Sequence, residues 1–357
     1  MKGFGAGLRN RNPLVLVAAA ALLALILVVT EVFFTTGAWS GVPLKFWMRK
    51  ASDDYTYVSW TVGTNMQHPP KTPAVYLLGG STAREAVTSG DALAAEIEEL
   101  GGPEVAAWDL ASMNQNFAQS LAIADNVPNS PAWILIGLNM GRFTPDRGAS
   151  MKQVVGRELL LKSAFLQQYV AREYGKYEHS RTILPGIFSY MVSWAREHRA
   201  ELQKGSLRTR EYGQHRYNLK HIHTVAQKEE MVATWNERRY PAFRRNLGFN
   251  LAMLEQLLIR CQERGLHPVL VELPNNRDLI GKRFDYAEAQ YRAPSQALAA
   301  EYDVPYLDFN HELDLRNADF HDLSHLVEPG RVIWQRRLAQ ELVRLMGADG
   351  KGAGTQP

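Results

Sequence analysis

The sequence predicts an α/β protein built on a doubly wound parallel β-sheet of about five strands, with helices on both faces. Short apolar runs of the length of buried strands recur after residue 71. Segments with helical periodicity separate these runs, and this alternation favours parallel strands joined by crossover helices. The chain has 357 residues, of which 46% are hydrophobic and 22% charged, as is typical of globular proteins.

The expected elements follow one another in regular alternation. The predicted strands are residues 75–78, 105–110, 133–138, 268–273 and 304–309. The predicted helices are residues 91–100, 117–126, 247–264, 286–302 and 329–345. Gly101 and Gly265 stand where two of these helices should end, as glycine commonly does.

The N-terminal segment, residues 1–35, is predicted to be a membrane anchor. Residues 14–29 form an uninterrupted apolar run that resumes at residues 32–34, which gives about the twenty residues needed to cross a bilayer. A cleaved signal peptide is the alternative, but the apolar run is long for one and Thr36-Gly37-Ala38 is a poor cleavage site. We therefore expect an uncleaved, single-pass anchor.

The orientation of this anchor does not follow from charge alone. Three basic residues precede the apolar run and three follow it: Lys2, Arg9 and Arg11, and Lys45, Arg49 and Lys50. A short N-terminus before a first helix usually stays in the cytoplasm. We therefore expect the rest of the chain to lie outside the cytoplasm.

The remaining sequence divides by composition. Residues 36–70 read as a linker that ends in His68-Pro69-Pro70, and residues 71–346 hold the α/β domain. The glycine-rich residues 347–357 are expected to be a disordered tail. The net charge of +3 is too small to indicate nucleic-acid binding, and no nucleic-acid motif is present.

A basic helical insert, residues 147–244, interrupts the predicted domain. It holds 18 Lys and Arg residues against 9 Asp and Glu residues, so its net charge is about +9 and the rest of the chain is net acidic. It is much longer than a normal loop, so it is a lid, a subdomain or a contact surface. Either its helices simply carry a solvated charged face, or they meet anionic lipid headgroups or an acidic polymer.

Polar residues that could carry chemistry follow the predicted strands. Ser81 comes after Gly79-Gly80 at the end of the first strand. Asn114 and Asn139 follow the second and third strands. Ligands of open parallel sheets bind beyond the carboxyl ends of the strands, so these residues should lie together.

The Ser81 turn also has a structural interpretation. Thr82 and Glu85 have the Thr-x-x-Glu spacing of a capping box, so the segment could be a glycine turn with ordinary helix caps. A serine at such a turn is nevertheless exposed beside helix N-terminal N–H groups that favour negative charge.

Acyl transfer needs a nucleophile, a base, a group that orients the base and donors for the oxyanion. Ser81 could attack, His325 could take its proton, and Asp322 could orient the imidazole. The donors could be the Ser81 N–H, the Asn139 amide and Asn114. The structural alternatives are a loop histidine and an N-capping aspartate.

These blocks resemble the SGNH hydrolase family, also called GDSL-like lipases and esterases. The matching segments are Gly79-Gly80-Ser81, Gly137-Leu138-Asn139 and Asp322-Leu323-Ser324-His325. The resemblance covers about residues 71–146 and 245–346, and it implies a serine nucleophile with a histidine base and an aspartate partner. It also implies an oxyanion hole made by the nucleophile's N–H, a second-block glycine and the asparagine. This chain departs from the pattern near Asn114, where that glycine is replaced, and at Met140, where many members have aspartate.

The anchor and the divergent domain together look like the membrane-attached members of that family that act on envelope polymers. The resemblance implies an esterase or O-acyltransferase outside the cytoplasm, acting on an acylated cell-envelope polysaccharide or a related polymer such as teichoic acid. Some such members work beside a membrane-bound O-acyltransferase, which would then be a partner. A binding or assembly module that kept the fold while its site decayed is the rival hypothesis.

A metallohydrolase is a third hypothesis. His321 and His325 are four residues apart, as in a zinc-binding helix, but that motif requires Glu after the first histidine and Asp322 stands there. His221 and His223 form another candidate pair. The lone Cys261 excludes an intramolecular disulfide and a Cys-based zinc site. No metal and no cofactor are expected.

Overall fold

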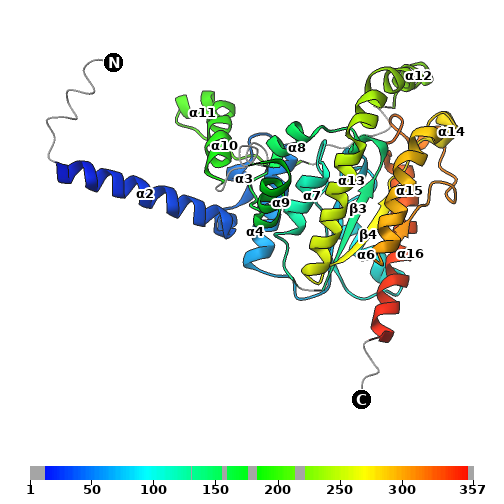
Figure 1. The fold of residues 1–357 in the computed structure, drawn as a ribbon, viewed down its shortest axis with the longest axis horizontal. Coiled ribbons are helices and arrows are strands. Elements are labelled where there is room, and N and C mark those ends of the chain that lie inside the picture. The colour runs from blue at the N-terminus through cyan, green and yellow to red at the C-terminus, as the bar shows by residue number, and fades with distance from the viewer. Residues whose placement is uncertain (1–12, 130, 155–158, 176–182, 214–221, 353–357) are drawn as a thin grey trace.

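The computed structural model describes residues 13–129, 131–154, 159–175, 183–213 and 222–352. Figure 1 shows two parts, a long N-terminal helix that projects outward and an α/β domain from which it emerges. The domain is a central sheet covered by helices on both faces.

The sheet has five parallel strands, so the predicted α/β class is confirmed. The strands are β1 Ala74–Leu78, β2 Ala106–Asp109, β3 Ala132–Leu138, β4 His267–Glu272 and β5 Tyr306–Leu307. Their order across the sheet is β2-β1-β3-β4-β5, and every pair is parallel. All residues of β1 and β3 are buried, as expected for strands covered on both faces.

Alternate side chains of the strands build two apolar cores. Tyr76 and Ile134 point to the core shared with α4 Asp54–Gln67, α7 Phe117–Ala124, α13 Tyr240–Glu263 and α15 Asp285–Glu301. Leu77 and Leu135 point to the core shared with α6 Gly90–Glu99 and α16 Glu328–Gly352. Because successive side chains of a strand face opposite sides, the apolar runs can feed both cores.

Residues 36–70 are not a linker, contrary to the prediction. They form the 3₁₀ helix η1 Ala38–Gly41, the short helix α3 Leu44–Trp47 and α4. Tyr55, Val58 and Val62 of α4 are buried in the main core. These apolar residues recur at helical spacing, but intervening threonines and an asparagine hide the pattern.

The C-terminal tail also differs in part from the prediction. Helix α16 runs to Gly352, so the first residues of the expected tail 347–357 are helical. Residues 353–357 lie outside the described part of the chain.

The described parts of the insert are mostly helical, as predicted, but they do not form a separate subdomain. The insert holds α8 Arg147–Val154, α9 Ala164–Tyr174, α10 Leu184–Glu197, α11 Arg199–Gln203, α12 Val225–Thr234 and the π-helix η5 Trp235–Arg239. Leu166 and Val170 of α9 belong to the main core, α10 contacts the N-terminal helix, and α12 with η5 leads into α13. The insert therefore contributes to three different parts of the molecule.

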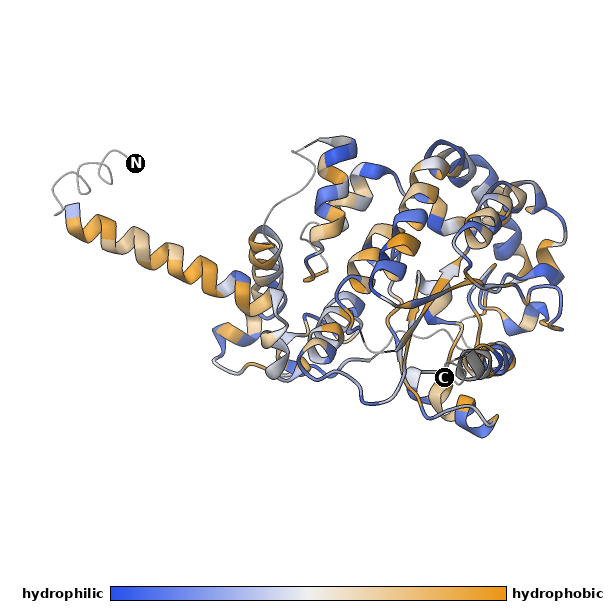
Figure 2. Ribbon diagram, turned by 60° about the horizontal axis from the view of Figure 1, so that its bottom comes forward, coloured by the Kyte–Doolittle hydropathy of each residue, from blue (hydrophilic) through white to orange (hydrophobic). Residues whose placement is uncertain are grey.

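The N-terminal helix α2, Pro13–Thr35, projects away from the domain (Figures 1 and 2). Its most apolar window has a mean hydropathy of 2.8, and none of that window is buried. Figure 2 shows the helix as an almost continuous apolar rod. By length and composition it is able to cross a membrane, although a signal sequence would share these properties.

Candidate active site

Ser81 lies at the turn that follows β1. It opens the short helix α5, Ser81–Arg84, and Gly80 is the N-cap. Gly79 is required there because a Cβ atom at this position would lie 2.5 Å from the Cβ of Ala83. This close approach lets the chain turn directly from strand to helix and leaves Ser81 at the helix N-terminus.

The predicted capping box at this turn is wrong. The helix begins at Ser81, and no side chain caps it. The Thr82 hydroxyl instead contacts the Ser324 hydroxyl at 3.2 Å, and the Glu85 carboxylate pairs with Arg331 at 2.8 Å. Both side chains therefore bind tertiary partners and do not cap the helix.

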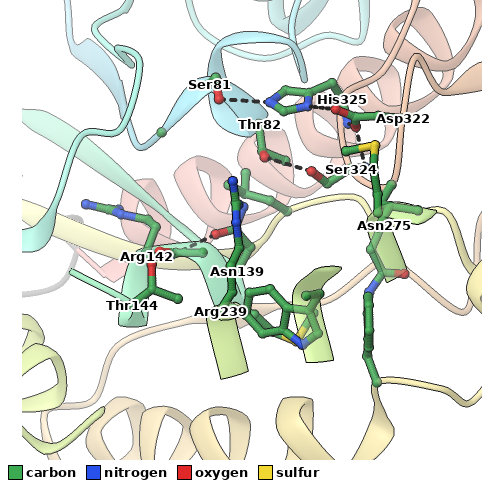
Figure 3. Close-up of a pocket in the computed structure, with 18 of the residues that line it drawn as sticks. Ser81, Thr82, Asn139, Arg142, Thr144, Arg239, Asn275, Asp322, Ser324 and His325 are labelled. Atoms are coloured by element: carbon green, nitrogen blue, oxygen red, sulfur yellow. Dashed lines mark hydrogen bonds and ion pairs between the residues drawn. The ribbon is translucent and has the colours of Figure 1, made fainter. Parts of the chain in front are cut away.

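Ser81, His325 and Asp322 form one hydrogen-bonded chain (Figure 3). His325 Nε2 lies 2.8 Å from Ser81 Oγ, and His325 Nδ1 lies 2.7 Å from Asp322 Oδ2. The other carboxylate oxygen of Asp322 accepts from the backbone N–H groups of Ser324 and His325 at 2.9 and 3.0 Å. The three side chains proposed from the sequence are therefore brought together.

The charge on Asp322 sets the roles of the imidazole nitrogens. Burial alone would raise the pKa of Asp322, but the hydrogen bond and charge of His325 and the two backbone N–H groups hold it well below its usual range. An ionised carboxylate only accepts, so His325 Nδ1 carries the proton. In a neutral imidazole, Nε2 is then free to accept the proton of the Ser81 hydroxyl.

The loop that carries Asp322 and His325 is held by residues that the sequence did not single out. The buried Lys228 ammonium, from the insert, donates to Phe320 O at 2.8 Å and to Asn317 Oδ1 at 2.7 Å. Asn276 Nδ2 donates to Asp322 O at 3.0 Å. No local pattern marks either residue, because the groups they bind lie far away in the sequence.

Asn139 lies at the carboxyl end of β3, as predicted. It caps the 3₁₀ helix η2, Met140–Phe143, and its Oδ1 accepts from the Arg142 N–H at 3.1 Å. This contact orients the amide group. Among the described residues, its NH₂ group has no protein partner, and Asn139 lines a cavity that Ser81 also lines.

Asn114 has a left-handed backbone, with φ of 57°. Glycine adopts this conformation most easily, and asparagine is one of the few other residues that tolerate it. The backbone at position 114 is therefore one that both glycine and asparagine can adopt. Within the described part of the chain, the backbone N–H groups of Asn114 and Ser81 donate to no other protein group.

Both asparagines and the Ser81–His325 pair line one cavity of about 770 Å³. Ser81 follows β1 and Asn139 follows β3, the strand on the other side of β1 from β2. The chain places β2 on one side of β1 and β3 on the other, so the order in which strands are added reverses between β1 and β3. In open parallel sheets, ligands bind at such a point. The insert supplies one wall, from residues of α12 and η5: Gln227, Glu230, Met231, Thr234, Trp235 and Arg239.

Buried ion pairs support the turn that carries Ser81. Arg84 Nη1 lies 2.5 Å from Asp54 Oδ2, and its Nε lies 3.3 Å from Glu85. Arg331 pairs with the other oxygen of Glu85 at 2.8 Å. All four side chains are buried, so each charge depends on its partners.

A third buried arginine, Arg142, lies behind Asn139. Its guanidinium donates to Gly137 O at 2.8 Å and Ser120 Oγ at 2.6 Å, and it lies 4.1 Å from the ring centroid of Phe117. Burial lowers its pKa to about 9. These contacts tie the segment after β3 to helix α7.

The histidine pairs considered as metal ligands have other contacts. His325 is bonded to Ser81 and Asp322, and the His321 and His223 rings lie 4.3 Å apart. His221 lies outside the described residues. The described residues contain no group of three or more His, Cys, Asp or Glu side chains placed to hold a metal ion.

Comparison with known proteins does not identify the chain: no protein-family model matches it, and no curated protein is similar to it. Function is therefore inferred from the geometry of the site.

Proposed function

We propose that the protein is a serine acyl hydrolase or O-acyltransferase of SGNH type. The observation that carries this proposal is the hydrogen-bonded chain from Asp322 through His325 to Ser81, which opens on a cavity lined by Asn114 and Asn139. A nucleophile, a base, an orienting carboxylate and oxyanion donors are the parts that acyl transfer requires.

In the first step, Ser81 Oγ attacks the carbonyl carbon of an ester while its proton passes to His325 Nε2. The carbonyl oxygen becomes negative, and the Ser81 N–H, the Asn114 N–H and the Asn139 NH₂ are the candidate donors to it. The tetrahedral intermediate collapses, and the leaving alcohol takes the proton from His325. Asp322 stays ionised and stabilises the imidazolium while it exists.

In the second step, water or a polymer hydroxyl attacks the acyl-Ser81 carbonyl and gives its proton to His325. Collapse releases an acid or a new ester and returns the proton to Ser81 Oγ. Hydrolysis and transfer differ only in this acceptor. The cavity of about 770 Å³ is larger than an acetyl group requires, so it has room for an acceptor beside the acyl-serine.

The fold supports the assignment to the SGNH type. The strand order β2-β1-β3-β4-β5, with helices on both faces, supports a doubly wound arrangement. The left-handed backbone of Asn114 removes the main objection that the replaced second-block glycine raised. The Ser81–His325 distance of 2.8 Å also argues against a decayed binding module.

We further propose that α2 is an uncleaved single-pass anchor with a cytoplasmic N-terminus, which holds the domain outside the cytoplasm. The substrate would then be an acylated polysaccharide or another polymer of the cell envelope. A membrane-bound O-acyltransferase would be a natural source of acyl groups. The length and hydropathy of α2 support the anchor.

A fluorophosphonate probe tests the nucleophile. We expect the wild-type protein to be labelled and Ser81→Ala not to be labelled. Ser206→Ala, which changes an exposed serine that does not line the cavity, is the matched control and should be labelled like wild type. Absence of labelling of the folded wild-type protein would contradict the proposal.

Product analysis then separates hydrolysis from transfer. The purified protein is incubated with an acylated model sugar, with and without an unacylated acceptor sugar. Free acid in both reactions indicates an esterase, whereas acylated acceptor indicates a transferase.

A further inference from the structure

The C-terminal end of α2, residues 31–35, which we call its foot, packs against the domain. Phe34 is buried, and its ring stacks on that of Trp39 with centroids 5.4 Å apart. The Glu31 carboxylate accepts from the Ile183 N–H at 3.0 Å and from Lys162 Nζ at 3.0 Å. These contacts tie α2 to the insert, so the helix has a defined direction relative to the domain.

Helix α10 packs beside this foot and is amphipathic. Ile187 and Tyr190 are buried in the aromatic cluster around Phe34. On the outer face, Phe188 is 72% exposed, Met191 41% and Val192 44%. These three residues lie at positions i, i+3 and i+4, so they form one apolar stripe on the surface.

Large apolar side chains are exposed on the segment that follows α2 as well. Val42 and Phe46 are also exposed. Trp194 of α10 donates through Nε1 to Phe46 O at 3.0 Å, which places the two segments against each other. We call Val42, Phe46, Phe188, Met191 and Val192 the apolar patch. An exposed group of large apolar side chains commonly marks a surface that contacts another apolar phase.

Basic residues border the apolar patch. Residues 183–213 contain five Lys and Arg residues against three Glu residues, and Glu201 is already paired with Arg210 at 3.1 Å. Arg196, Arg199 and Lys204 are exposed. An apolar helix face with a basic border is typical of helices that lie in the headgroup region of a bilayer.

We propose that α10, together with the apolar patch, lies in the lipid–water interface of the membrane that α2 crosses and forms a second membrane contact. Helix α10 contacts α2, and Figure 1 shows α10 and α11 on the side of the domain from which α2 projects. Trp47, which contacts Phe34 of α2, is only half-buried, and tryptophan side chains favour the interface. Two contacts fix the orientation of the domain on the membrane, whereas a flexible tether would let it rotate. The inference rests on the proposed membrane anchorage of α2.

Site-directed fluorescence in vesicles tests the inference. Leu22, Phe188 and Val332 are each replaced by cysteine in the full chain and labelled with an environment-sensitive fluorophore. The native Cys261 is fully buried and burial raises its pKa to about 12, so the unsubstituted chain serves as the labelling blank. Val332 is the matched control, because it is 51% exposed on a helix, α16, that lies away from α2 (Figure 1).

After reconstitution into vesicles that contain anionic lipid, quenchers attached to the lipids report the depth of each label. We expect Leu22 to be quenched from the acyl-chain region and Phe188 from the headgroup boundary, about 5–10 Å deep. Val332 should stay in water. If the label at position 188 reports a water environment while the label at position 22 is quenched, the inference is overturned and the anchor remains supported.

Two other outcomes have distinct meanings. If Leu22 itself is not quenched, the proposed anchorage fails and this inference fails with it. If Phe188 is shielded in native membranes but water-like in vesicles of pure lipid, a protein partner covers the apolar patch and the lipid interface is refuted. Quenching in pure-lipid vesicles shows that lipid alone is sufficient.

Discussion

Replacing Asp322 by asparagine tests the proposed site most directly, because it keeps the shape of the side chain and changes only its charge and its hydrogen bonding. In the native protein, Oδ1 accepts from the backbone N–H groups of Ser324 and His325, and Oδ2 accepts from His325 Nδ1. The asparagine carbonyl can satisfy the two backbone donors only if it takes the Oδ1 position. Its NH₂ group then faces His325 Nδ1.

An NH₂ group donates, so His325 Nδ1 must become the acceptor and the proton must move to Nε2. In this tautomer, Nε2 donates to Ser81 Oγ and is no longer able to take its proton. The same exchange in a Ser-His-Asp site lowers kcat about 10⁴-fold, which corresponds to about 5.5 kcal/mol of barrier. We expect a loss of that size here, with Ser81 still present and correctly placed.

The second-order rate constant for fluorophosphonate labelling measures this loss without knowledge of the natural substrate. Asp314→Asn is the matched control, because Asp314 is an exposed aspartate of the same region that pairs only with Arg316 in the described structure. It should be labelled at the wild-type rate. If Asp322→Asn is labelled within about tenfold of wild type, then Asp322 does not set the tautomer of His325 and the proposed role is incorrect.

The same substitution has a stability signature whose sign follows from the lowered pKa. A carboxyl group with a depressed pKa in the folded state stabilises the fold above its unfolded pKa, and this contribution is lost as the pH falls. The wild-type protein should therefore have a larger unfolding free energy than Asp322→Asn at pH 7. The gap should narrow as the pH falls below about 4, and thermal unfolding at several pH values measures it.

Three further substitutions test other parts of the molecule. Asn114→Gly should retain the probe-labelling rate if the backbone N–H is the donor. Asn114→Ala should be labelled more slowly, and its unfolding free energy should be about 1 kcal/mol lower, because alanine is strained at positive φ. Equal labelling rates and equal stabilities of the two variants would contradict this prediction. Arg84→Met removes a buried ion-pair partner of Asp54 and Glu85 and should lower the unfolding free energy, measured in urea, by about 3–5 kcal/mol. A change below about 1 kcal/mol would show that these two carboxylates do not depend on Arg84. Burial raises the pKa of Glu272 to about 7, so the wild-type protein should lose about 3 kcal/mol as the pH rises from about 4.5 to 7, and Glu272→Gln should remove that loss. A difference between wild type and Glu272→Gln that does not vary with pH would contradict the assignment.

Elements with a strong local pattern followed from the sequence. The apolar runs at β1 and β3 and the long apolar segment of α2 were predicted close to their observed bounds. Their burial or exposure depends on side chains a few positions apart, which periodicity captures. The placement of Ser81 and Asn139 at one edge also followed, because parallel strands end at the same side of a sheet.

Elements whose stability comes from distant partners were not predicted from the sequence. Helix α4 was read as a linker because its buried face is interrupted by polar residues, and only the core it packs against makes it a helix of the domain. Thr82 and Glu85 fit a capping box locally, yet Ser324 and Arg331 compete for them. Tertiary hydrogen bonds and ion pairs overrode the local preference in both cases.

The sequence by itself therefore determined the sheet, the apolar helix and the residue types available at the carboxyl edge, since these depend on short-range periodicity and strand direction. Only the tertiary structure decided that Ser81 and His325, 244 residues apart, lie 2.8 Å from each other. The same holds for Lys228, which the insert buries beneath the loop of Asp322, and for α10, which packs beside α2. Such contacts are set by how whole elements pack, and no local pattern along the chain encodes them.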